Sequence, residues 1–185
     1  MKKSIKRILS VVLATAVVAS SAMSMEASAA AKKAKVAFNV YCFTADNKWL
    51  AGDGNGNQKV SKVVTVKKGK KVNVTLTVKG AAKKGVQVLT VDSGNSTLSG
   101  STKGILKTFK KCKYSNVVVK CDGKTVKAPY MQGYFESDTK TESWRLSLYN
   151  TYGSNGDNTK TKCKANAKKI KFKKSLQVSF SFVAK

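Results

Sequence analysis

The sequence predicts an all-β protein, an antiparallel β-sandwich of the jelly-roll type. Apolar and polar residues alternate over 72–78 and again over 175–182, as expected of strands that bury one face. Turn-forming Gly and Asn residues, as in 53–57 and 153–156, separate such runs. No segment keeps a 3.6-residue hydrophobic period, so helices are not expected.

Short strands follow one another along the whole domain. In order, we expect them at 35–43, 59–66, 72–78, 85–91, 104–109, 116–121, 124–129, 131–136, 144–149 and 175–182. Asp122-Gly123 stands between two of these strands and predicts a two-residue hairpin turn. Many short strands with regular turns are typical of sandwiches.

The first 29 residues have the features of a cleaved signal peptide. Lys2, Lys3, Lys6 and Arg7 precede an apolar run over 8–18, and Ala27-Ser28-Ala29 offers a cleavage site. A transmembrane anchor is the alternative, but serines interrupt the apolar run too early. We therefore predict a signal peptide over 1–29, a flexible tail over 30–35 and a β-sandwich domain over 36–185. The expected location is extracellular, free or associated with the cell wall, without membrane insertion after cleavage.

The charge is strongly positive and comes from lysine. The chain of 185 residues has 36 Lys+Arg, 9 Asp+Glu and no His, for a net charge of +27. Removing 1–29 takes away four basic residues and Glu26, which leaves +24. Lysine is a flexible point charge, so this composition favours diffuse attraction to polyanions over specific nucleic-acid recognition. Edge and turn lysines also protect sheets from aggregation, and that reading explains many of them.

The absence of histidine and the four cysteines limit the chemistry. Histidine-dependent catalysis and histidine-bearing zinc sites are excluded. Cys42, Cys112, Cys121 and Cys163 permit up to two disulfides in an exported protein, with Cys112–Cys121 and Cys42–Cys163 as one pairing. Free buried thiols are the alternative.

Four stretches resemble a known class of domain. They are 84–92, 121–124, 144–153 (Trp-Arg-Leu-Ser-Leu-Tyr-Asn-Thr-Tyr-Gly) and the terminal strand 175–182. In this order they resemble the jelly-roll, carbohydrate-binding-module-like domains of secreted proteins from clostridial gut and rumen bacteria. The resemblance spans most of 35–183 and implies a non-catalytic, glycan-binding domain. The early aromatic residue of that pattern, after a short acidic turn, matches Trp49 after Asp46.

Two groups of residues are candidates for the ligand site. Sugar rings stack on flat aromatic side chains, while amides and carboxylates bond their hydroxyls. Trp49 with Asp46 in a polar loop is the first candidate, and core packing is its alternative. The second candidate comprises Tyr149, Asn150, Tyr152 and Asp157, with Tyr149 facing outward if the alternation from Trp144 holds; a structural turn is the alternative. Tyr130, Tyr134 and Phe135 beside Gln132 form a weaker third group.

Neither a cofactor nor a catalytic site is expected. The run 53–57 resembles the start of a calcium loop, but Val64 occupies the position of the bidentate glutamate of an EF-hand. A looser structural calcium site stays open. Glu136, Asp138 and Glu142 could supply a glycosidase pair, yet with no surrounding signature they fit better as partners of lysines.

The sequence therefore predicts a secreted, non-catalytic protein that adheres to a polysaccharide or other glycan, including an acidic one, with help from its positive charge. The alternative is a lysine-rich surface protein that binds an anionic cell-wall polymer or another polyanion without a sugar pocket.

Overall fold

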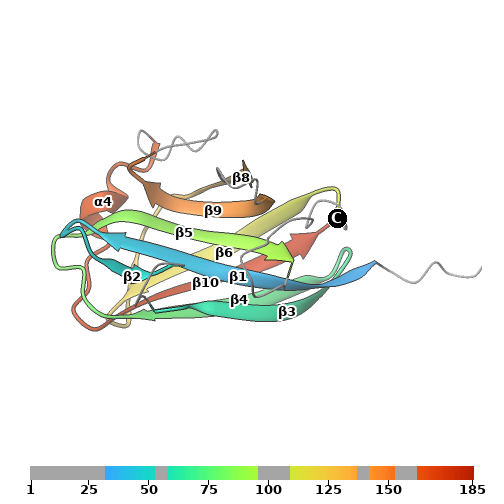
Figure 1. Cartoon of the computed structure of the whole chain (residues 1–185), viewed down its shortest axis with the longest axis horizontal. Coiled ribbons are helices and arrows are strands. Elements are labelled where there is room, and N and C mark those ends of the chain that lie inside the picture. The colour runs from blue at the N-terminus through green and yellow to red at the C-terminus, as the bar shows by residue number, and fades with distance from the viewer. Residues whose placement is uncertain (1–31, 53–57, 96–108, 137–141, 153–161) are drawn as a thin grey trace, which may run out of the picture. The chain divides into compact units, whose positions relative to one another are not determined.

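A computed structural model describes residues 32–52, 58–95, 109–136, 142–152 and 162–185. These residues form two antiparallel sheets that pack face to face, which confirms the all-β sandwich (Figure 1). The predicted signal peptide over 1–29 lies outside the described residues. Within the described ranges, no helix has the length and hydropathy needed to cross a bilayer.

The larger sheet, sheet A, has six strands in the order β2-β1-β5-β9-β8, with β3 also paired to β1. Its strands are β1 (Lys33–Thr44), β2 (Trp49–Ala51), β3 (Ser61–Lys67), β5 (Val86–Asn95), β8 (Met131–Glu136) and β9 (Glu142–Asn150). Sheet B has the order β4-β10-β6-β7. Its strands are β4 (Lys71–Lys79), β6 (Cys112–Cys121), β7 (Lys124–Val126) and β10 (Ser175–Ala184).

The chain crosses repeatedly between the sheets. It passes from β3 in sheet A to β4 in sheet B, back to β5, and over again to β6. A path of this kind is the one expected of a jelly roll, in which neighbouring strands of a sheet are distant in sequence. The alternation predicted for 72–78 is present, since Val74, Leu76 and Val78 are buried and the residues between them exposed.

The core between the sheets is built around four aromatic rings. Phe38 of β1 packs on Tyr114 of β6 and on Phe180 and Phe182 of β10, with ring centroids 5.0 to 6.4 Å apart. All four side chains are buried. Edge-on aromatic contacts add to the burial of their large apolar area, so this cluster holds sheet A against sheet B.

Several boundaries differ from the predicted ones. β1 begins at Lys33, inside the range assigned to the flexible tail, because Lys33 to Lys35 already pair with β3. The helix α4 (Asn166–Lys169) was not predicted, since four residues are too few to show a helical period. Of the strand expected at 104–109, only Phe109 is described, and it is buried outside any strand.

The Asp122-Gly123 hairpin is confirmed. Cys121 pairs with Lys124, and both turn residues have positive φ, 48° and 82°, as a type I′ turn requires. The turn has a second role that the sequence pattern did not indicate. The Asp122 carboxylate accepts hydrogen bonds of 2.7 to 2.9 Å from the backbone amides of Lys173, Lys174 and Ser175, which fixes the entry into β10.

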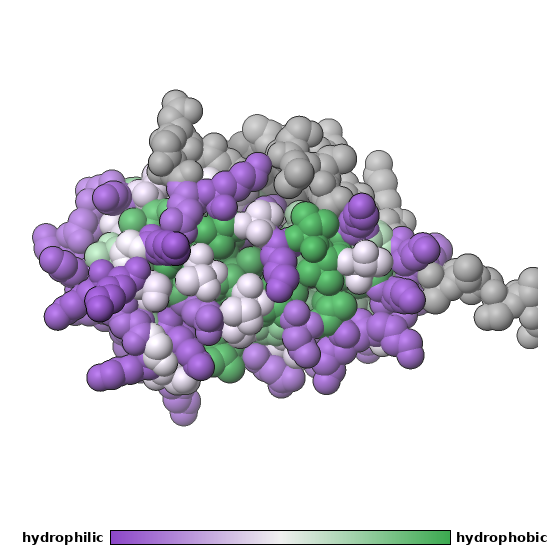
Figure 2. Space-filling view, turned by 90° about the horizontal axis from the view of Figure 1, so that it is seen from below, coloured by the Kyte–Doolittle hydropathy of each residue, from purple (hydrophilic) through white to green (hydrophobic). Residues whose placement is uncertain are grey.

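The face of the domain seen from below is mostly hydrophilic at its rim (Figure 2). Figure 2 views it from the side on which β3 and β4 lie in Figure 1 and shows a group of hydrophobic side chains encircled by hydrophilic ones. On this side, β3 lies at an edge of sheet A and β4 at an edge of sheet B, since among the described strands β3 pairs only with β1 and β4 only with β10.

Candidate functional site

Trp49 lies at an edge of sheet A and not in a loop as predicted. It opens β2, opposite Phe43 of β1, and the connecting turn is closed by a 2.9 Å hydrogen bond from the Thr44 amide to the Lys48 carbonyl oxygen. The indole is 38% exposed. Its ring centroid lies 4.8 Å from that of Phe43 at an angle of 37°, so one face rests on a neighbouring ring.

Gly52 leaves room for this arrangement. A Cβ atom at position 52 would lie 3.3 Å from the Trp49 ring and 3.6 Å from the Tyr41 ring. The position is therefore shared by two aromatic side chains. Tyr41 and Phe43 are half-buried on the outer face of sheet A, while the alternate residues Val40 and Cys42 point into the core. We call Tyr41, Phe43 and Trp49 the aromatic platform.

Polar side chains of the adjoining turn and of β5 are linked in pairs. Asp46 forms an ion pair with Lys84, 3.1 Å between Oδ1 and Nζ, and both side chains are well exposed. The Asn47 Oδ1 atom accepts a 2.8 Å hydrogen bond from the side-chain amide (Nε2) of Gln87. Exposed pairs of this kind contribute little to stability, so they are available to exchange partners with a ligand.

The platform continues across the sheet as one row of side chains. Phe43 is paired with Val88 of β5, and Val88 with Asn150 of β9. Asn150 is 5% exposed, and its Oδ1 atom accepts a 3.0 Å hydrogen bond from the Tyr152 amide, so it stabilises the turn after β9. The Tyr152 side chain is 66% exposed. Of the described members of the second predicted cluster, Tyr152 is therefore the one whose side chain is open to a ligand.

The outward orientation predicted for Tyr149 is wrong. Tyr149 is 8% exposed and belongs to the core. The pairing of β5 with β9 shifts between Leu89 and Thr90, which are opposite Tyr149 and Ser147. Leu148 is therefore the extra residue of a β-bulge, which turns both Leu148 and Tyr149 inward. Trp144, in contrast, is partly buried and packs against the core.

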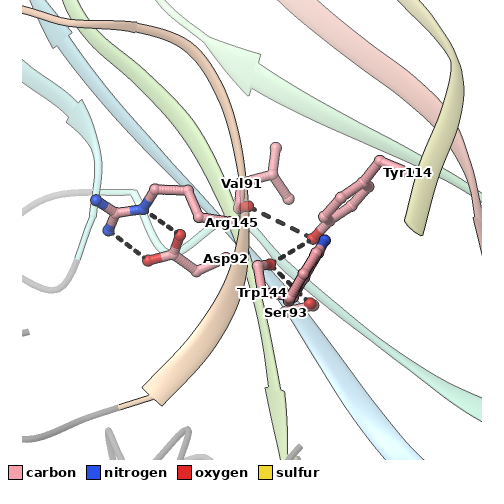
Figure 3. A network of polar contacts seen from close by, with 6 residues as sticks. All are labelled: Val91, Asp92, Ser93, Tyr114, Trp144 and Arg145. Carbon is pink, nitrogen blue, oxygen red and sulfur yellow. Dashed lines mark hydrogen bonds and ion pairs between the residues drawn. The ribbon is translucent and has the colours of Figure 1, made fainter. Parts of the chain in front are cut away.

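A polar network around β5 and β9 ties the two sheets together (Figure 3). Tyr114 of sheet B reaches across the core, and its hydroxyl donates to the Trp144 carbonyl oxygen at 3.1 Å. The Ser93 hydroxyl donates to the same oxygen at 2.8 Å. Burial raises the pKa of Tyr114 well above its usual value, so the hydroxyl stays a donor.

The network includes an ion pair that sequence reasoning missed. Arg145 of β9 donates to both carboxylate oxygens of Asp92 on β5, at 2.6 and 2.7 Å, and its guanidinium lies 3.1 Å from the centroid of the Phe135 ring. Both charged side chains are largely buried. One signal was available: Arg145 is the single arginine after residue 29. Arginine suits a two-point, stacked ion pair that lysine cannot make.

The four cysteines form no disulfide: of the two alternatives, the structure has buried thiols at all four positions. Cys112 and Cys121 are the two ends of β6, and nine steps of a strand at about 3.3 Å separate them by roughly 30 Å, far beyond the reach of an S–S bond. Cys42 lies in the core, and Cys163 lies at the turn that leads into α4. Burial raises the pKa of Cys42 and of Cys112 to about 12.

The remaining candidates are Gln132 and Tyr134, which the structure describes, and Asp157 and the run 53–57, which it does not. Gln132 accepts from the Tyr114 amide at 2.6 Å and donates to the Tyr114 carbonyl oxygen at 2.9 Å, so it is a structural link between the sheets. Tyr134 of β8 is 42% exposed. Asp157 and the run 53–57, the candidate calcium loop, lie outside the described residues. Among the described residues, no group of three potential metal ligands comes together.

Comparison with known proteins adds no relative: no family model, curated protein or solved structure matches this chain. The resemblance to carbohydrate-binding modules stays a prediction.

Proposed function

We propose that this chain is an exported, non-catalytic protein that adheres to a glycan through the aromatic platform. The observation that carries the proposal is the position of Trp49, a large apolar ring held half-exposed at a sheet edge by Phe43. An indole fixed in this way presents a flat face to solvent without the entropy cost of ordering it on binding.

The surroundings of Trp49 suit a saccharide. The C–H face of a pyranose stacks on the indole, while Asp46, Asn47 and Gln87 supply acceptors and donors for hydroxyls from the adjoining turn and β5. Tyr152 offers a second exposed ring in the turn that follows β9, two residues after Asn150. The net charge of +24 after removal of 1–29 attracts acidic glycans over a distance of about 8 Å at physiological salt.

The test compares Trp49→Ala with Tyr134→Ala on the chain from residue 30 onward. Tyr134 is the matched control because it is an exposed ring of β8, which lies at the opposite edge of sheet A from β2. Each protein is measured against a panel of polysaccharides by pull-down and calorimetry. We expect Trp49→Ala to lose at least about tenfold in affinity and Tyr134→Ala to retain it. Equal affinities of the two variants contradict the proposal.

Polyanion binding without a sugar pocket is the second candidate, and the exposed lysines favour it. The turn between β3 and β4 alone displays Lys67, Lys68, Lys70 and Lys71. The two functions differ in their response to salt. Binding by lysines alone falls steeply as salt rises and is insensitive to Trp49→Ala, whereas stacking persists at high salt.

Export is tested separately from binding. Mass spectrometry of the protein recovered from the culture medium identifies its first residue. We expect Ala30, and a chain that keeps residues 1–29 and stays with the cells contradicts export.

A further inference from the structure

The edge between β3 and β4 forms a groove that neither the aromatic platform nor the core explains. Its volume is about 410 Å³, and residues 58–62 line one wall while Thr75, Leu76, Thr77 and Lys79 line the other. It lies on the side of the domain where Figure 2 shows hydrophobic side chains encircled by hydrophilic ones.

The wall formed by β4 is the free edge of sheet B among the described strands, since β4 pairs there only with β10. The Gly80 backbone amide donates to the Lys174 carbonyl oxygen at 2.9 Å, on the side of β10. The Lys79 backbone amide points the other way and donates to the side-chain oxygen of Gln58 at 2.9 Å. Because successive residues of a strand direct their amides to opposite sides, those of Asn73, Thr75 and Thr77 share the outward direction of Lys79. In the described part of the chain, no backbone hydrogen bond joins them to β3.

Gln58 shows what this edge accepts. Its side-chain oxygen takes the place that a carbonyl oxygen of an added strand would occupy opposite Lys79. The next outward amides along β4 recur every second residue, about 6.8 Å apart, which is the spacing of carbonyl groups in an extended polypeptide. A saccharide chain has no matching row of alternating acceptors and donors.

The charge of the groove selects the partner. Lys59, Lys62 and Lys79 line it, and among the described residues none of those that line it is acidic. Lys62 is paired with Phe38, whose side chain is in the core, so Lys62 belongs to the inward face of β3. Val60 and Leu76 add apolar surface between the lysines. A second copy of this chain, itself strongly positive, is repelled.

We propose that this groove binds an extended acidic segment of another protein, which adds to sheet B as a strand beside β4. Backbone hydrogen bonds to Asn73, Thr75 and Thr77 give the register, and the lysines pair with acidic side chains. The proposal is independent of glycan binding, because β4 lies in sheet B and the aromatic platform in sheet A.

The experiment uses a short peptide of alternating glutamate and valine as the probe, with the chain from residue 30 onward. The control peptide has the same sequence with N-methyl groups on alternate residues, which keep the charge and remove the backbone donors. The variants are Lys62→Glu in the groove and Lys124→Glu on β7, the opposite edge of sheet B. Affinities are measured by calorimetry, and amide hydrogen exchange follows Asn73, Thr75 and Thr77.

We expect Lys62→Glu and N-methylation each to weaken binding at least about tenfold, while Lys124→Glu has little effect. Exchange of the three β4 amides slows when the probe binds. The proposal is overturned if the N-methylated peptide binds as tightly, if both lysine variants lose affinity equally, or if the probe does not bind at all. The last outcome assigns Lys62 to protection of the edge against aggregation.

Two further measurements separate this proposal from the glycan proposal. Trp49→Ala retains peptide binding, and Lys62→Glu retains glycan binding at high salt.

Thr75→Pro removes one outward amide, and edge strands tolerate such a change. Circular dichroism of this variant confirms its fold before its affinity is compared.

Discussion

The Arg145 guanidinium binds both carboxylate oxygens of Asp92, at 2.6 and 2.7 Å, while it rests on the Phe135 ring. The two residues are direct partners on β9 and β5, so their contact joins neighbouring strands at the centre of sheet A. We expect Asp92→Asn to lower the free energy of unfolding by about 3 kcal/mol, because it leaves a largely buried guanidinium without its counter-charge. Urea denaturation measures the change.

The matched control for this prediction removes both charges. Asp92→Leu with Arg145→Met replaces the ion pair by apolar side chains of similar size, which is often close to neutral in buried sites. The double variant is therefore expected to be more stable than Asp92→Asn. A double variant that is the less stable of the two would show that the pair stabilises the domain beyond mutual neutralisation.

The Tyr114 hydroxyl gives a second prediction. Tyr114→Phe keeps the ring in the aromatic core and removes the hydrogen bond to the Trp144 carbonyl oxygen. Since Ser93 still donates to that oxygen, we expect a modest loss of about 1 kcal/mol. Thermal unfolding is compared with that of Tyr134→Phe, which removes an exposed 3.3 Å hydrogen bond to Glu142 and is expected to cost less, because water replaces an exposed partner. Equal losses in the two variants contradict a specific role for Tyr114.

The buried thiols make the fold sensitive to alkali. Burial raises the pKa of Cys42 and Cys112 from 9.0 to about 12, so the folded state holds these protons more tightly than the unfolded chain. The resulting stability is fully present below pH 9 and is lost as the pH rises toward 12. We expect Cys42→Ala with Cys112→Ala to flatten the fall in stability over this range, although the cavities lower stability at neutral pH.

Alkylation by iodoacetamide offers an independent check on the thiols. At neutral pH the folded protein should react slowly at all four cysteines, because the thiolate is the reactive form and the side chains are buried. After denaturation all four should react. Rapid labelling of the folded protein would contradict the burial of the thiols.

Asp122 predicts the opposite dependence in acid. Hydrogen bonds from the backbone amides of Lys173 and Ser175 lower the pKa of this carboxyl below its usual 3.8. The stability that the ionised form contributes is present above pH 3.8 and is lost as the pH falls through the folded-state pKa. Asp122→Asn keeps a residue that tolerates positive φ and removes the charge. The stability difference between the two proteins should therefore shrink as the solution is acidified, which pH-dependent urea denaturation follows.

Gly85 and Gly69 form a matched pair of substitutions. Both have positive φ, 109° and 75°, so alanine strains the backbone at either position. A Cβ atom at position 85 would lie 1.9 Å from the Ala167 carbonyl oxygen of α4, whereas nothing lies within 4 Å of one at position 69. We expect Gly69→Ala to cost about 1 kcal/mol and Gly85→Ala clearly more, by displacing α4. Similar melting temperatures would contradict the close approach of α4 to β5.

The sequence was informative where structure is local. The alternation along β4 and β10 and the Asp122-Gly123 turn follow from neighbouring residues, and the structure has all three. Tyr149 was misplaced because a bulge depends on how β5 and β9 pair, and alternation within one strand does not reveal it. The ion pair of Asp92 with Arg145 joins residues far apart in the sequence and needed the strand order.

The candidate site was predictable only in part. Trp49 and Tyr152 are exposed as a ligand site requires, while Asn150 and Tyr149 have become structural. The contact of Trp49 with Phe43 depends on the pairing of β1 with β2. The groove at β4 depends on the order of the strands, which decides which strand lies at the edge of each sheet. Both are properties of the assembled sheets.

The position of β10 has a consequence for the timing of folding. It is the last strand in the chain, yet it lies between β4 and β6 and pairs with both. Until residues 175–184 have been synthesised, β4 has no partner among the described strands and β6 pairs with β7 alone, so sheet B lacks its central strand. Sheet B is therefore completed only after every described strand of sheet A has been synthesised, so that β10, made after all of them, joins the two halves of the sandwich.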